Sequence, residues 1–63
     1  MADDFLHTCQ EEMGEIATEI AMLENGQILA ETDYDRVMRI RRLRRVLMRL
    51  TALVEELEAA GNP

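Results

Sequence analysis

The apolar residues in the first part of the chain recur every three or four positions. This spacing is typical of one face of an α-helix and matches the a and d positions of a heptad. The residues that follow it are Leu6, Cys9, Met13, Ile16, Ile20 and Leu23. Asp3 or Asp4 can cap the start of such a helix, and the pair Asn25-Gly26 is typical of a helix end. We therefore predict a helix over residues 4–25.

A second helix is indicated after a polar stretch. Thr32 or Asp33 can accept a hydrogen bond from a free backbone N–H of the first turn. Asp35, three residues after Thr32, makes an imperfect capping box. Gly61 stands where a helix commonly ends, shortly before a proline that cannot continue one. We predict this helix over residues 33–60.

Residues 26–32 connect the two predicted helices. Because Ile28, Leu29 and Ala30 make this connector more apolar than a free loop, we expect it to fold back on the end of the hairpin. A frayed extension of the first helix is the alternative. We expect the Tyr34 ring to pack back over the connector. Two helices and one short connector predict a single all-α domain, an antiparallel helical hairpin.

The apolar residues of the second helix span an arc of roughly 140°, at about 100° per residue. The candidate partner-binding residues in this arc are Leu43, Val46, Leu47, Leu50, Leu53, Val54 and Leu57. One facing helix cannot cover so wide an arc, and a lone core in a chain of 63 residues is marginal. We therefore expect a partner to complete a bundle, either further copies (a dimer or tetramer) or a foreign protein. The alternative is that residues 28–30 fold over the arc. Because the second helix is the longer one, we expect its Leu57 end to lack cover.

Charge is segregated along this chain, whose net charge is −6. All seven basic residues are arginines between positions 36 and 49, and all 13 acidic residues lie outside that segment. The arginines opposite the apolar arc are Arg41, Arg42, Arg44, Arg45 and Arg49. They form a solvated face that Glu12 and Glu19 partly neutralise across the hairpin, or a docking strip for an acidic protein, or a strip for nucleic-acid phosphates. An acidic chain argues against general nucleic-acid binding.

No pattern in the chain indicates catalysis. Cys9 is the only cysteine, and we expect it to be a buried, inert residue of the apolar seam. His7 and Cys9 are the only imidazole and thiol, so we predict no metal site and no cofactor. A two-helix hairpin offers no cleft for an active site. No apolar run approaches the ~20 residues that span a bilayer, and the acidic start has no signal-peptide core. We expect a cytoplasmic protein that is not an enzyme and does not bind membranes.

The order of features resembles the small co-chaperones of type III secretion needle subunits, the YscE/PscE family. The matching positions are Asn25-Gly26, then Glu31-Thr32-Asp33-Tyr34, then an apolar helix from Val37 to Leu57. In that family a short helical hairpin pairs with a larger helical-repeat chaperone, and together they hold the needle subunit before secretion. The resemblance therefore implies a non-catalytic adaptor that binds a helical protein.

Two functional hypotheses follow. The first is a small helical adaptor or co-chaperone that binds a helical partner through the wide apolar face of the second helix, with the arginines steering an acidic partner. The second is a homodimeric bundle, similar in shape to plasmid Rop dimers, that binds nucleic acid through the arginine face. Binding of the second kind would be salt-sensitive and largely non-specific.

Overall fold

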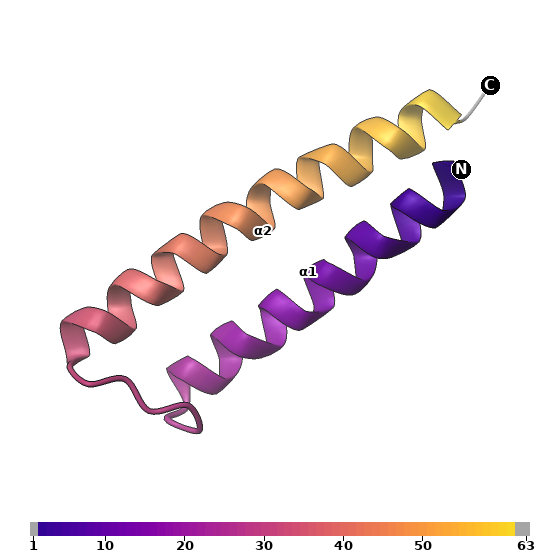
Figure 1. Ribbon diagram of the computed structural model, residues 1–63. Helices are drawn as coiled ribbons and strands as arrows, with labels where there is room; N and C mark the ends of the chain where they lie inside the picture. Colours follow the sequence, from indigo (N-terminus) through magenta and orange to yellow (C-terminus); the bar gives the residue numbers. More distant parts are fainter. Residues whose placement is uncertain (1, 62–63) are drawn as a thin grey trace.

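The computed structural model describes the backbone of residues 2–61 and the side chains of residues 4–61. It has two helices, α1 (Ala2–Glu24) and α2 (Asp33–Gly61), which form an elongated antiparallel hairpin of 48 × 15 × 15 Å (Figure 1). No strand occurs among residues 2–61. The predicted all-α hairpin is confirmed, and the helix bounds lie close to the predicted ranges 4–25 and 33–60.

The start of α1 differs from the prediction. Because the helix already includes Ala2, Asp3 and Asp4 lie inside its first turn and do not cap it. The carbonyl of Asp4 accepts a hydrogen bond from the Thr8 hydroxyl at 2.9 Å. A bond of this kind, between residues four apart, is typical of a threonine within a helix. The negative charge of Asp4 still favours this end of the helix, since the free N–H groups make it electropositive.

The end of α1 is fixed by the Asn25-Gly26 pair, as the sequence predicted. Gly26 has a φ of 82°, a conformation that glycine adopts without steric cost. The N–H of Gln27 then reaches back to the carbonyl of Met22 at 2.9 Å, the long bond of a Schellman motif. The side-chain oxygen of Asn25 accepts a second hydrogen bond from the same N–H at 3.1 Å. The chain therefore turns away from the helix axis at Gly26.

The connector folds back only in part. The N–H of Ile28 also donates to the carbonyl of Met22, at 3.1 Å, and the side chains of Ile28 and Ala30 are half-buried. Leu29 is 90% exposed. Residues 25–32 contain no helix, so the connector is not a frayed extension of α1. Residues 28–30 leave most of the apolar arc of α2 uncovered, because Leu29 points into solvent.

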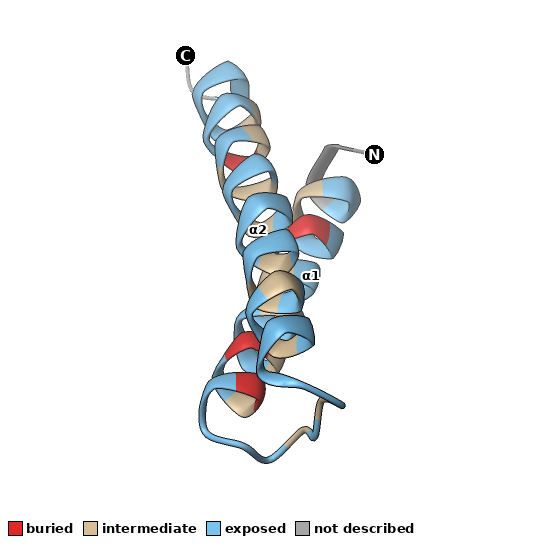
Figure 2. Ribbon diagram, turned by 90° about the vertical axis from the view of Figure 1, so that its left-hand side faces the viewer, coloured by how far each residue is buried: buried red, intermediate tan, exposed pale blue. Residues whose placement is uncertain are grey.

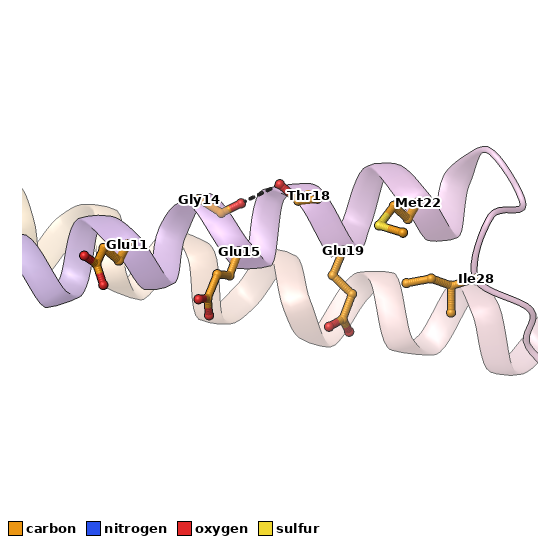
Figure 3. A pocket seen from close by; sticks show the side chains of 7 residues that line it. All are labelled: Glu11, Gly14, Glu15, Thr18, Glu19, Met22 and Ile28. Atoms are coloured by element: carbon orange, nitrogen blue, oxygen red, sulfur yellow. Dashed lines mark hydrogen bonds between the residues drawn. The ribbon is translucent and has the colours of Figure 1, made fainter.

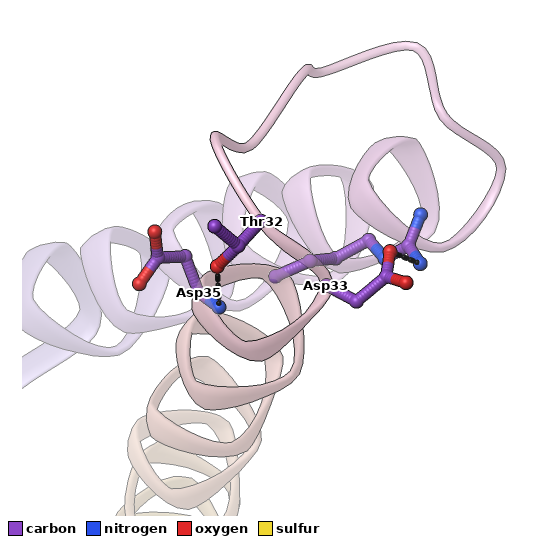
Figure 4. Close-up of polar contacts among 4 residues, drawn as sticks. Thr32, Asp33 and Asp35 are labelled. Carbon is purple, nitrogen blue, oxygen red and sulfur yellow. Dashed lines mark hydrogen bonds and ion pairs between the residues drawn. The ribbon is translucent and has the colours of Figure 1, made fainter.

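Thr32 caps α2 (Figure 4). Its hydroxyl oxygen accepts a hydrogen bond from the N–H of Asp35 at 3.0 Å, and its carbonyl accepts the first helical bond from Arg36 at 3.1 Å. Asp33 and Arg36 form an ion pair at 2.6 Å, one turn apart. The prediction for Tyr34 is wrong: its ring is 71% exposed. At about 100° per residue, Tyr34 lies on the side of α2 that faces away from α1.

The buried core is small and unequal between the helices (Figure 2). Its members among the described residues are Cys9, Ile20, Leu23 and Val54. Cys9 is therefore buried, as predicted. The expectation that the Leu57 end of α2 lacks cover is wrong, since Val54 is buried and Leu57 half-buried. The reason is that α1 begins at Ala2, so the start of α1 and the end of α2 lie at the same end of the hairpin (Figure 1).

Candidate partner-binding surface

The apolar arc of α2 is incompletely covered by α1. Of the candidate residues, Val54 alone is buried, at 7% exposure, and Val46 is 43% exposed. The half-buried ones are Leu43, Leu47, Leu50, Leu53 and Leu57. The structure thus brings all seven together as one continuous strip, but α1 fills only its centre. The arc is wider than one helix can cover, as its spacing in the sequence indicated.

The uncovered part of the arc lies on one side of the hairpin. At about 100° per residue, Val46 and Leu53 lie roughly a quarter turn from Val54, and Arg39 lies on the same side. Arg39 bonds to Glu19 of α1, which shows which side of α1 is adjacent. We call this side the Val46 face. It contains Phe5, Glu12, Glu15 and Glu19 of α1, and Arg42, Val46, Arg49 and Leu53 of α2.

Two ion pairs join the helices, one on each side of the hairpin. The Glu19 carboxylate accepts hydrogen bonds from Arg39 at 3.0 and 3.2 Å on the Val46 face. Arg44 donates to Glu24 at 2.9 Å on the opposite side. Glu19 thus does reach the arginine segment, although its partner Arg39 is not one of the five arginines opposite the apolar arc. Because all four side chains are partly exposed, each pair stabilises the hairpin by at most about 1 kcal/mol.

Most of the arginine face has no partner within the hairpin. The five candidate arginines are all exposed, and Arg44 has Glu24 beside it. The four that form no ion pair with any described residue are Arg41, Arg42, Arg45 and Arg49. Like charges four residues apart on a helix repel one another. The arrangement therefore leaves a positive surface that an external anionic group would stabilise.

A groove runs along the outer side of α1 (Figure 3). Its volume is about 650 Å³, and it is lined by Glu11, Gly14, Glu15, Thr18, Glu19, Met22 and Ile28. The three carboxylates project to the same side, one helical turn apart, and Met22 and Ile28 lie together near the connector. Sequence reasoning did not find this groove, although the four-residue spacing of the three glutamates would have placed their carboxylates on one face.

A second hollow, of about 340 Å³, lies on α2 beside the Val46 face. It is lined by Tyr34, Asp35, Met38, Arg39 and Arg42. Sequence reasoning also missed this hollow, because it placed the Tyr34 ring over the connector. The four-residue spacing from Tyr34 to Met38 to Arg42 was the available signal, since it aligns these side chains along one side of the helix.

No three His, Cys, Asp or Glu side chains among the described residues lie where they would hold a metal ion. The Cys9 thiol is buried between the helices. Neither helix, over the described range, has an apolar stretch of the length that crossing a bilayer requires.

Comparison of the chain with protein-family models, with curated proteins and with solved structures finds no match.

Proposed function

We propose that this protein is a small non-catalytic adaptor or co-chaperone that binds a helical protein through the wide apolar face of α2. The observation that carries the proposal is the half-open apolar strip of this helix. A folded monomer buries most of its large apolar side chains, and α2 buries only Val54 fully. Val46 has 43% of its surface exposed at the edge of the strip. A partner that covered the strip would remove this apolar surface from water.

The spacing of the strip supports a helix as the bound element. Val46, Leu50, Leu53 and Leu57 follow one another at intervals of four, three and four residues. This is the spacing that another helix matches when its side chains pack between those of α2. The neighbouring arginines would increase the association rate of an acidic partner more than its affinity. The resemblance to needle co-chaperones, which pair with a larger helical-repeat chaperone, supports the same role.

The proposal is tested by placing a charge in the strip. Val46→Asp puts a carboxylate at the edge of the strip, where 43% of the Val46 surface is exposed. Met48→Asp is the matched control, because Met48 is 73% exposed and points almost the opposite way on the same helix. In affinity capture from a cell lysate, the wild type and Met48→Asp should retain the same protein at a constant ratio, and Val46→Asp should lose it.

Two results would refute the proposal. One is the absence of any stoichiometric complex, either with another protein or with further copies of the chain. The other is a complex that Val46→Asp forms as tightly as Met48→Asp does. Circular dichroism of each purified variant shows whether its helices are intact, so that loss of binding is not confused with unfolding.

The unpaired arginines support a second candidate, a Rop-like dimer that binds nucleic acid. Arg41, Arg45 and Arg49 are exposed at four-residue intervals, and arginine binds phosphate groups well. Affinity for a mixed-sequence RNA or DNA should then fall steeply between about 50 and 200 mM salt. Changing the three arginines to glutamine should flatten this dependence. If the protein does not bind either polymer at the lowest salt, this candidate is excluded.

A further inference from the structure

We propose that the helical partner of the Val46 face is a second copy of this chain, placed so that α1 of each copy lies on α2 of the other. The result is a four-helix bundle in which every neighbouring pair of helices is antiparallel. This inference rests on the proposed function, because it names the partner of the same surface. Three features of the hairpin support it: its excess surface, the position of its exposed apolar side chains and the distribution of its charges.

The exposed surface of the hairpin is larger than that of a compact monomer. The chain has a mass of 7.3 kDa and an accessible surface of 5070 Å². A compact monomer of that mass exposes about 4,200 Å². The excess, roughly 900 Å², is close to the ~800 Å² that each partner buries in a stable interface of standard size. One further copy is therefore enough to cover it.

The apolar side chains of the Val46 face are placed to meet those of a second copy. Phe5 is 52% exposed at the start of α1, and Val46 and Leu53 lie along α2. Because the start of α1 and the end of α2 lie at the same end of the hairpin (Figure 1), Phe5 lies near the level of Leu57. Rotation about a two-fold axis parallel to the helices leaves every residue at the same height along the bundle. Phe5 of each copy would therefore pack near Leu53 and Leu57 of the other.

The charges of the Val46 face complement those of a second copy in the same arrangement. Both helices rise by the same distance per residue. Glu12 of α1 therefore lies at about the same height along the hairpin as Thr51 of α2, and Glu19 at about the height of Arg44. The two ion pairs between the helices agree with this alignment, because Glu19–Arg39 deviates from it in one direction along the helices and Glu24–Arg44 in the other. With α1 of one copy on α2 of the other, Arg49 lies within about one turn of Glu12, and Arg42 within about one turn of Glu19. Each of these contacts occurs twice, because the interface is two-fold symmetric.

The other two-fold arrangement of this face is unfavourable. It places α1 on α1 and α2 on α2, so that glutamates meet glutamates and arginines meet arginines. Like charges placed together across an interface are strongly destabilising.

The opposite side of the hairpin is less suitable. There Arg44 already has Glu24 of α1 as its partner, and the neighbouring α1 residues on that side are the uncharged Gln10, Ala17 and Ala21. The favoured dimer is therefore the one that pairs the Val46 faces of two copies with α1 of each on α2 of the other.

The oligomeric state of the purified chain gives the first test. Light scattering on a sizing column should show a dimer that dissociates on dilution. Val46→Asp should raise the dimer dissociation constant at least about tenfold, because it places a charge at the centre of the interface. Met48→Asp, on the other side of α2, should leave the constant within about threefold of the wild-type value. A wild-type chain that stays monomeric at about 1 mM overturns the inference, and so does a dimer that Val46→Asp does not weaken.

Exchange of charges tests the arrangement and does not depend on whether one variant folds alone. Arg49→Glu and Glu12→Arg should each dimerise poorly, and their equimolar mixture should form a 1:1 heterodimer. For the wild type, added salt should weaken the dimer, since the facing charges attract. If the wild type instead prefers Arg49→Glu to itself, α2 lies on α2 and the arrangement is wrong.

Failure of this inference can be told apart from failure of the proposed function. A wild-type monomer that captures a foreign protein, and loses it on Val46→Asp, overturns the second copy as the partner while the adaptor function stands. A monomer that captures nothing overturns both.

Discussion

The same substitution, glycine to alanine, should have opposite effects at two positions of this hairpin. Gly14 lies in the middle of α1, and a Cβ built there meets no atom within 4 Å. Glycine inside a helix costs about 1 kcal/mol relative to alanine, because it loses more backbone freedom on folding. With open space for the methyl group, no steric cost offsets this gain. Gly14→Ala should therefore raise the free energy of unfolding by about 1 kcal/mol.

At Gly26 the backbone conformation decides the outcome, although a Cβ there also meets nothing within 4 Å. Its φ of 82° lies in the left-handed region, where a Cβ crowds the chain's own carbonyl oxygen. The cost for a residue other than glycine is about 1–2 kcal/mol. Gly26→Ala should therefore lower the free energy of unfolding by at least about 1 kcal/mol, and it should loosen the Gln27–Met22 hydrogen bond that ends α1.

Urea and thermal unfolding followed by circular dichroism would measure both variants at one chain concentration, because any self-association adds to the apparent stability. The variants should differ by about 2 kcal/mol, a factor of roughly 30 in the folding equilibrium. Their midpoint temperatures should lie on opposite sides of the wild-type value, each shifted by about 4–8 °C. If Gly14→Ala destabilises the protein, another backbone approaches α1 at that position and the reasoning is wrong.

Four further results are expected from the same unfolding assay. Leu23→Ala should cost about 2–5 kcal/mol, since Leu23 is fully buried, and a loss under 1 kcal/mol would mean that α1 and α2 do not pack as described. Thr32→Ala should cost about 1 kcal/mol through loss of the α2 cap, with Thr32→Ser close to wild type. Glu19→Gln, which weakens the contact with Arg39, should cost under about 1 kcal/mol, and the difference should shrink in 1 M salt. Leu29→Ser should change stability by less than about 0.5 kcal/mol, and a larger loss would place Leu29 in a contact that the hairpin lacks.

Much of this fold follows from local rules that the sequence states directly. The three-to-four spacing of apolar residues specifies two helices, because it aligns their side chains on one face. Thr32 and Gly26 mark helix ends through bonds made within a few residues of themselves, so no distant contact was needed to predict them. The width of the apolar arc on α2 also follows from spacing alone, and with it the expectation of a partner.

Only the tertiary structure decided how the two helices share that arc and which charges meet. The predicted cap at Asp3 or Asp4 was wrong because α1 already includes Ala2, and the apolar spacing along a helix does not show its first residue. The exposure of Tyr34 and the choice of Arg39 as the partner of Glu19 depend on the rotation of each helix about its own axis. That rotation is set by the side chains of both helices packing together, so a pattern read along one helix cannot give it.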